Sequence, residues 1–354
     1  MHYFLIAASA LLVLAGVTVL VFYVFATVLL KKNFRRMDFE ANTESISYED
    51  IKDRFPREEF TFKSKKNALS AYLYRAGSGD DLVVYVHGMC PGHQAYLSDI
   101  ISLLQRGFSV FTYDFTGTGS SEGDGYCGIN QQFFDLPCAV EFLRSKDQFG
   151  FKDVFLYGHS MGGYAVACCR DSIFSSVVSI SGFDSPVKEL VSAFATGKSK
   201  FFKLLAELMI RVKYFIDQGP VYDLKAHEVL KDTDLYTLVI HGSEDELVPF
   251  EDISVVSKKD LINNQKVEYL ALTEPPHTGH NSVIASDECI KYQKEKMEIF
   301  NNALKEYNDR QKAREIMLSD FDVFKFNAAN EDLMDTVDKF FRTHRKSGGG
   351  SGDA

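Results

Sequence analysis

A seven-residue segment in the middle of the chain constrains its fold more strongly than any other feature. Residues 157–163 read Tyr-Gly-His-Ser-Met-Gly-Gly, follow the apolar run 154–156 and precede a helical stretch. A G-x-S-x-G sequence between a strand and a helix forms a turn so tight that small residues must flank the serine, whose hydroxyl then projects above the sheet. The segment therefore predicts a strand–turn–helix unit in which Gly158 and Gly162 flank Ser160, a candidate nucleophile.

Short apolar runs alternate with stretches of helical periodicity on both sides of this segment. Runs such as Leu-Val-Val-Tyr-Val at 82–86 are apolar throughout, which is typical of strands buried on both faces of a parallel sheet. Amphipathic stretches at 93–105 and 131–145 lie between such runs. The alternation predicts an α/β fold with a mostly parallel sheet flanked by helices. Eight strands are expected, at 59–63, 69–74, 82–87, 109–115, 154–159, 176–181, 236–241 and 267–272.

Two further helical segments interrupt the alternation. Residues 186–231 lie between the sixth and seventh expected strands, and a charged helical insertion occupies residues 289–324 before a final amphipathic stretch at 331–342. The glycine- and serine-rich end at 346–354 is typical of a flexible tail. The pattern predicts one domain over residues 58–345.

The N-terminal region is almost entirely apolar. Residues 4–30 form a run of 27 residues without a charge. At about 1.5 Å per residue, such a helix exceeds the roughly 30 Å hydrocarbon core of a bilayer. A cleaved signal peptide is the alternative, but no Lys or Arg precedes the run, and its length is about twice that of a usual signal core. We therefore expect a single-pass membrane anchor at 1–32 and a polar tether at 33–57.

Charge and cysteine content narrow the classes of partner. Lys31, Lys32, Arg35 and Arg36 follow the apolar run at once, which favours a cytosolic position for the domain. The formal net charge of −10 argues against nucleic acid as a partner. The six cysteines form no CxxC pair and no set with zinc-ligand spacing, so we expect reduced, buried thiols and no metal site.

Two loops downstream of Ser160 offer the groups that a serine nucleophile needs. A serine hydroxyl requires a base to take its proton, and in this type of fold an acid and then a histidine follow the serine along the chain. Residues 244–246, after the seventh expected strand, are Glu-Asp-Glu, and the loop after the eighth strand contains His277 and His280. Asp184, after the sixth strand, is a further acid. Both loops lie where catalytic groups collect, outside the carboxyl ends of the strands.

Five motifs in order make the chain resemble the α/β-hydrolase superfamily, in particular the branch of monoacylglycerol lipases and serine aminopeptidase-like proteins. They are His87-Gly88-Met89, residues 114–123, 158–163 and 242–249, and Gly279-His280. The resemblance implies an α/β-hydrolase fold with a helical cap at about 186–231. It also implies Ser160 as nucleophile, Asp245 as acid and His280 as base, with the N–H groups of Met89 and Met161 forming the oxyanion hole.

The competing residues have more ordinary roles. Glu244 and Glu246 are expected to be solvated loop charges, His277 and His241 loop residues, and His87 and His159 structural. The chain departs from the family at Thr116, where an arginine is usual, and at Cys90, whose thiol we expect to be a bystander near the oxyanion site. Neither departure removes a group that the chemistry requires.

The resemblance implies a serine hydrolase that needs no cofactor. The favoured substrate is a carboxylic ester of lipid-like or acyl type, because eight apolar cap residues could line an acyl-chain site, unless they pack on the core: Phe194, Phe201, Phe202, Leu204, Leu205, Leu208, Met209 and Phe215. A peptidase or amidase is the alternative, with Glu189 or Glu207 holding a substrate amine. A non-catalytic binding module on a hydrolase fold is a third possibility.

Overall fold

The computed structural model describes residues 2–39, 44–77 and 80–346, and it contains a single eight-stranded sheet. The strands are β1 (Arg57–Ser64), β2 (Asn67–Tyr74), β3 (Asp81–Val86), β4 (Ser109–Tyr113), β5 (Asp153–His159), β6 (Ser176–Ile180), β7 (Tyr236–Gly242) and β8 (Val267–Leu272). Their order in the sheet is β1-β2-β4-β3-β5-β6-β7-β8. The pairs β1–β2 and β2–β4 are antiparallel, and the pairs from β4–β3 to β7–β8 are parallel. The predicted fold class and all eight predicted strands are confirmed.

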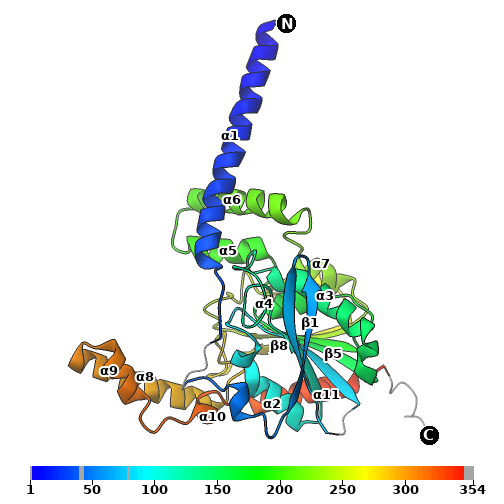
Figure 1. The fold of residues 1–354 in the computed structure, drawn as a ribbon. Helices are drawn as coiled ribbons and strands as arrows, with labels where there is room; N and C mark the ends of the chain where they lie inside the picture. The colour runs from blue at the N-terminus through cyan, green and yellow to red at the C-terminus, as the bar shows by residue number, and fades with distance from the viewer. Residues whose placement is uncertain (1, 40–43, 78–79, 347–354) are drawn as a thin grey trace.

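Helices cover both faces of this sheet (Figure 1). Alternate side chains of β3 enter different layers: Val84 packs with α3 (Gln131–Ser145) and α4 (Met161–Ala167), and Val83 packs with α2 (Leu97–Gln105) and α11 (Glu331–Thr343). This two-sided burial explains the continuous apolar runs in the sequence. In the register of β3 and β5, Val86 lies opposite Gly158, so the loop after β3 begins beside the turn that holds Ser160.

The cap region forms three helices, α5 (Pro186–Ala195), α6 (Lys200–Gln218) and α7 (Ala226–Lys231). Figure 1 shows α6 lying above α5 on the side of the domain from which α1 (His2–Asn33) projects. The lower end of α1 packs there: Ala26 and Leu30 are buried, and the Tyr23 hydroxyl donates to Asp217 at 3.1 Å. Helix α1 is long and apolar enough to cross a membrane. A signal sequence near an N-terminus can be equally long and apolar.

The segment after α1 lies against the domain, which differs from the tether expected at 33–57. Phe34, Ile46 and Ile51 are buried, and the Arg36 guanidinium donates to the carbonyls of Gly119, Ser121 and Gly123. The polar composition of the segment obscured these few apolar anchors and the backbone acceptors that Arg36 reaches. Residues 40–43 lie outside the described residues.

The insertion at 289–324 forms α8 (Asp287–Tyr307), α9 (Arg310–Met317) and α10 (Val323–Phe326). In Figure 1, α8 and α9 project from the side of the domain, away from α1. Of the predicted tail, only Lys346 is described, and its N–H donates to Asp153 at 2.8 Å; residues 347–354 lie outside the described residues. All six cysteines are free thiols, but only Cys168 and Cys289 are buried, because the other four lie near the surface of helices and loops.

Candidate active site

Ser160 occupies the tight turn between β5 and α4. Its backbone φ of 57° and ψ of −118° fall where residues with a side chain are rarely found, and its N–H donates to the Ile180 carbonyl at 2.8 Å. A Cβ on Gly162 would lie 1.9 Å from the Val86 carbonyl oxygen, and one on Gly158 would lie 2.5 Å from the Gly162 oxygen. The two glycines are therefore required for the close packing that forms the turn.

The structure brings Ser160, His280 and Asp245 into one hydrogen-bonded line. His280 Nε2 lies 2.9 Å from Ser160 Oγ, and His280 Nδ1 lies 2.7 Å from Asp245 Oδ2. Because a carboxylate can only accept, Nδ1 carries the proton toward Asp245, and Nε2 accepts from the serine hydroxyl. The three residues follow β5, β7 and β8, whose parallel direction places their carboxyl ends at one edge of the sheet.

Asp245 is held as a carboxylate by its neighbours. Its Oδ1 accepts from the N–H groups of Leu247 and Val248 at 2.9 and 2.7 Å, and its Oδ2 lies 3.1 Å from His241 Nε2. Burial alone would raise the pKa of Asp245, but the hydrogen bonds from His241 and His280 outweigh it and hold this pKa well below its usual range. The site therefore keeps a negative charge beside the His280 ring.

His241 corrects one expectation, because it is not a loop residue. It belongs to β7, is fully buried, and its Nε2 contacts both Asp245 and the Val248 carbonyl at 3.0 Å. Since both contacts are acceptors, Nε2 carries a proton and orients the acid. The sequence signal was its position at the end of a strand, four residues before Asp245.

Glu244 and Glu246 are also more than solvated charges. Glu244 accepts from the Thr278 hydroxyl at 2.6 Å, and Glu246 accepts from the His280 N–H at 3.0 Å. Although both side chains are exposed, together they fasten the loop that holds the histidine to the loop that holds the acid. A single sequence does not show which loops will meet, so these contacts were missed.

The alternative acid and base lie elsewhere. His277 contacts Asp287 at 2.9 Å through Nε2 and the Ser282 carbonyl at 3.0 Å through Nδ1. Asp184 pairs with His227 at 2.9 Å. Neither residue is brought to Ser160.

The expected oxyanion donors border the nucleophile. Met161 begins α4 directly after Ser160, and a Cβ on Gly88 would lie 3.1 Å from the Ser160 Cβ, so the loop that carries Met89 packs against the serine. Within the described part of the chain, neither the Met89 N–H nor the Met161 N–H has a protein acceptor. Both donors are thus available to a ligand oxygen, and the N-terminus of α4 favours negative charge.

Two buried histidines support these loops. His87 lies with Nδ1 2.8 Å from the Gly88 carbonyl and 3.1 Å from the Cys90 sulfur, and burial lowers its pKa to about 4. His159 donates through Nε2 to the His280 carbonyl at 3.1 Å and accepts at Nδ1 from the Tyr96 hydroxyl at 2.8 Å. Burial lowers the pKa of His159 to about 3. Both rings are therefore neutral.

A cavity of about 530 Å³ opens over Ser160 and His280. Cap helix α5 contributes Glu189, Leu190 and Phe194 to its wall, and the end of α1 contributes Asn33 and Phe34. The Glu189 carboxyl is buried, and its Oε2 has no hydrogen-bond partner among the described residues. Burial, with the nearby charge of Asp245, raises the pKa of Glu189 to about 8. Glu207 lies outside this cavity and pairs with Lys188 and Arg211 at 2.9 and 2.8 Å.

The expected acyl-chain lining from α6 is wrong. Of the eight apolar cap residues proposed from the sequence, Phe194 alone lines the cavity. Five lie on the exposed surface of α6, so they neither line the cavity nor pack on the core: Phe201, Phe202, Leu204, Leu208 and Phe215. Among the described residues, no group of three or more His, Cys, Asp or Glu side chains is arranged to hold a metal ion.

The architecture is that of an α/β-hydrolase fold, and comparisons with known proteins agree with it. The family model described as "Serine aminopeptidase, S33" matches residues 77–211. The lysophosphatidylserine lipase ABHD12 of Danio rerio is 23% identical over 228 residues, which cover 59% of this chain and 56% of that protein. The chain thus spans about half the length of the curated relatives that it matches.

Solved structures share the architecture. An esterase of Pyrococcus furiosus matches 88% of this chain and 98% of its own with a TM-score of 0.56 and 15% identity. The acylaminoacyl peptidase of Pyrococcus horikoshii matches 84% of this chain and 43% of its own with a TM-score of 0.50 and 16% identity. At such low identity these likenesses show the fold alone. The chain has the α/β-hydrolase fold.

Proposed function

We propose that the chain is a serine hydrolase that cleaves a carboxylic ester through an acyl-enzyme on Ser160. The observation that carries the proposal is the line from Ser160 Oγ to His280 Nε2 at 2.9 Å and from His280 Nδ1 to Asp245 at 2.7 Å. A serine, an imidazole and a carboxylate in this order form the arrangement that activates a hydroxyl for attack on a carbonyl.

The geometry supports a two-step mechanism. Ser160 Oγ attacks the ester carbonyl carbon while His280 Nε2 takes its proton, and the N–H groups of Met89 and Met161 hold the oxyanion. The tetrahedral intermediate collapses, the C–O bond to the alcohol breaks, and His280 returns the proton to the departing oxygen. A water molecule, deprotonated by His280, then attacks the acyl-enzyme, and the acid leaves as Ser160 regains its proton. Asp245 stabilises the imidazolium in both steps.

A lipid-like acyl substrate fits the surroundings of Ser160. The cavity walls include Ile129, Phe183, Leu190, Phe194 and Leu247, so an acyl chain could lie on apolar surface beside the nucleophile. The likeness to a lysophosphatidylserine lipase supports an ester in preference to other acyl compounds.

Labelling with a fluorophosphonate probe tests the nucleophile. We expect wild-type protein to be labelled and Ser160→Ala to lose the label completely. Ser172→Ala, at an exposed serine of the same domain, is the matched control and should label like wild type. A Ser160→Ala protein that still labels at the wild-type level would overturn the proposal, and folded wild type that never labels would favour the binding-module alternative.

Glu189 favours a second candidate, cleavage of an amide bond next to a free amine. Its buried carboxyl, whose Oε2 has no partner in the described part of the chain, lies in the same cavity as Ser160 and could receive a substrate ammonium group. A panel of acyl esters and aminoacyl amides separates the candidates. If Glu189→Gln abolishes amide cleavage but spares ester cleavage, the peptidase alternative is supported; if wild type cleaves esters alone, it is wrong.

We also propose that α1 remains in the mature protein as a single membrane anchor, with the hydrolase domain in the cytosol. The support is the uncharged run of 27 residues and the basic cluster that follows it. Full-length protein should resist extraction from membranes by alkaline carbonate, and its domain should be cleaved by protease added to the cytosolic side. Release of the protein by carbonate would contradict the membrane anchor. Protection of the domain from the added protease would contradict the cytosolic orientation.

A further inference from the structure

Helix α6 carries an apolar stripe that nothing in the described structure covers. Five large side chains form it, with exposed fractions of 76% for Phe201, 66% for Leu204, 49% for Leu208, 56% for Phe215 and 52% for Ile216. At about 100° per residue, these positions fall within an arc of about 120° on one side of the helix. We call these five residues the α6 stripe.

The opposite side of α6 already meets the needs of the fold. Ile210 and Tyr214 are buried there and join the main core. Because a surface helix normally buries one apolar side and exposes a polar one, an apolar side remains on α6 after the domain is complete. Contiguous apolar surface of this kind marks a contact with another apolar phase.

The point at which α6 contacts α1 identifies this apolar phase as a lipid bilayer. The apolar run of α1 begins at Phe4, and about 20 residues of helix suffice to cross the hydrocarbon core, which brings the chain to Tyr23. Tyr23 is where α1 meets α6, through its bond to Asp217 at 3.1 Å and Lys213 above its ring at 5.0 Å. The remaining length of the run, about 10 Å at 1.5 Å per residue, lies beside the cap. Helix α6 is thus at the level where hydrocarbon gives way to headgroups.

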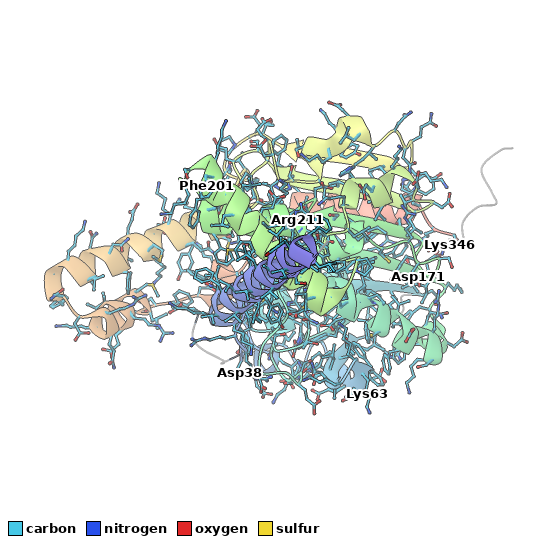
Figure 2. The ribbon with its side chains drawn as sticks, turned by 90° about the horizontal axis from the view of Figure 1, so that it is seen from above. Asp38, Lys63, Asp171, Phe201, Arg211 and Lys346 are labelled. Carbon is cyan, nitrogen blue, oxygen red and sulfur yellow. The ribbon has the colours of Figure 1, made fainter. Side chains whose placement is uncertain are left out.

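The orientation of α6 agrees with this level. Figure 1 shows α6 crossing the direction of α1 on the side of the domain from which α1 leaves. Figure 2, which looks onto that side, shows α6 running from the labelled Phe201 to α1, which is drawn across it. The buried side of α6 faces the domain, so the stripe faces outward, in the direction that α1 takes.

Unpaired basic side chains lie on α1 and at the start of α6. Lys31, Lys32 and Lys200 are exposed and form no ion pair within the described residues, whereas Arg211 and Lys213 are paired with acids of the cap. Unpaired lysines beside an apolar helix face are typical of helices that lie in the surface of an anionic bilayer.

We propose that α6 lies in the surface of the same bilayer that α1 crosses, with the α6 stripe among the acyl chains and the lysines at the headgroups. The cavity over Ser160 is bounded by cap helix α5 and by Asn33 and Phe34 at the end of α1, so it opens on the side of the domain that faces this surface. A substrate leaving the bilayer could then enter the cavity along the last turns of α1. This inference rests on the proposed anchor and deepens the proposed ester substrate to a membrane-resident amphiphile.

The absence of tryptophan from the sequence makes a sharp test possible. The full-length chain is prepared as Phe201→Trp and, separately, as Phe324→Trp, a matched exposed phenylalanine on α10. Each is reconstituted in vesicles of phosphatidylcholine and phosphatidylserine, with or without bromine on the acyl chains. We expect the tryptophan of Phe201→Trp to emit at shorter wavelength and to lose about half its fluorescence or more to brominated lipid, since stripe side chains lie about 5–10 Å deep. That of Phe324→Trp should be unaffected.

Four results would overturn the proposal or separate it from its premises. Equal, weak quenching of both tryptophans shows that α6 lies in water. A blue-shifted but unquenched Phe201→Trp that depends on protein density shows that a second copy of the chain covers the stripe instead. Quenching that persists in a Ser160→Ala background, or in protein that does not label with fluorophosphonate, supports the membrane contact even if the proposed hydrolase activity fails. Protein that does not float with the vesicles overturns the anchor and this inference together.

Discussion

The candidate triad and the α6 stripe are held in opposite ways within one domain. His280 and Asp245 are buried, and the loops that carry them are fastened by Glu244, Glu246 and His159. The stripe, in contrast, is fixed only through the helix that bears it, and its side chains are exposed. The difference shows where each region makes its contacts. The candidate triad makes its hydrogen bonds within the protein, whereas the stripe can be buried only against an apolar surface outside the domain.

This contrast has a physical basis. Proton transfer between Ser160 and His280 requires atoms placed to within a few tenths of an ångström, so neighbouring groups must restrict every side chain. Contact with acyl chains is non-directional and depends on the apolar area removed from water, so a stripe of suitable width and position is sufficient. The predictions below test both halves of the comparison.

Asp245→Asn tests how much the candidate triad depends on the negative charge beside His280. The amide would present a donor to His280 Nδ1, impose the wrong tautomer and leave the imidazolium without its carboxylate. We expect kcat to fall by about 10⁴-fold with little change in KM, as in other Ser-His-Asp sites. Steady-state hydrolysis of a soluble ester measures the effect.

The neighbouring carboxyl groups provide the control for this prediction. Glu244→Gln and Glu246→Gln make the same chemical change one residue away on either side, but their oxygens can still accept from Thr278 and His280. We expect these variants to retain activity within about tenfold of wild type, because the amide oxygen preserves a neutral hydrogen bond. A loss at Glu246→Gln as large as that at Asp245→Asn would contradict the assignment of the acid.

Gly162→Ala tests how tightly the turn at Ser160 is packed. The new Cβ would lie 1.9 Å from the Val86 carbonyl oxygen, a backbone atom of the central sheet that cannot move aside alone. We expect the free energy of unfolding to fall by about 3 kcal/mol, at the upper end of overpacking costs. Denaturation of the solubilised protein measures it. Gly77→Ala, whose Cβ would meet no atom within 4 Å, should change stability little; equal effects would show that the turn is not constrained as described.

The predictability of the two regions from sequence follows the same division. The eight strands and the position of Ser160 could be predicted because apolar runs, glycines and turn residues are local signals. The roles of Glu244 and Glu246 were missed because they depend on two loops, far apart in the chain, that meet only after folding. The role of His241 was missed although its partners, Asp245 and Val248, are only four and seven residues away. For α6, the sequence indicated an apolar helix but not which side the domain would bury, so its residues were assigned wrongly to the cavity.

Removing the α6 stripe tests the other half of the comparison. In the triple variant Phe201→Gln, Leu204→Gln, Leu208→Gln, glutamine preserves helix propensity but removes apolar surface. We expect kcat/KM for an acyl ester embedded in vesicles to fall by about tenfold, and hydrolysis of a short soluble ester to change by less than about twofold, because the triad is untouched.

A matched variant makes this result specific. Met297→Gln, Ile299→Gln, Ile316→Gln changes three exposed apolar residues of α8 and α9, which project away from α1 (Figure 1). It should leave both activities unchanged. Equal losses in the two triple variants, or equal losses on embedded and soluble esters, would show that the stripe does not serve access to the bilayer.

Glu189→Gln gives the smallest effect, at the point where the cap meets the triad. The pKa of Glu189 is raised from an ordinary 4.5 to about 8 by burial and by Asp245, so between these values the folded state keeps a proton that the unfolded state has lost. The stabilisation linked to the Glu189 carboxyl is therefore fully present below about pH 4.5 and declines as the pH rises to about 8.

Replacing Glu189 with glutamine removes this dependence of stability on pH. We expect Glu189→Gln and wild type to unfold at similar denaturant concentrations at pH 5, and the variant to unfold at the higher denaturant concentration at pH 9. Because all other titrating groups are common to both proteins, the difference between the two curves isolates Glu189. A difference that stays constant from pH 5 to pH 9 would show that this carboxyl is already ionised in the folded protein, which would favour its role as a receptor for a substrate amine over a neutral wall of an acyl site.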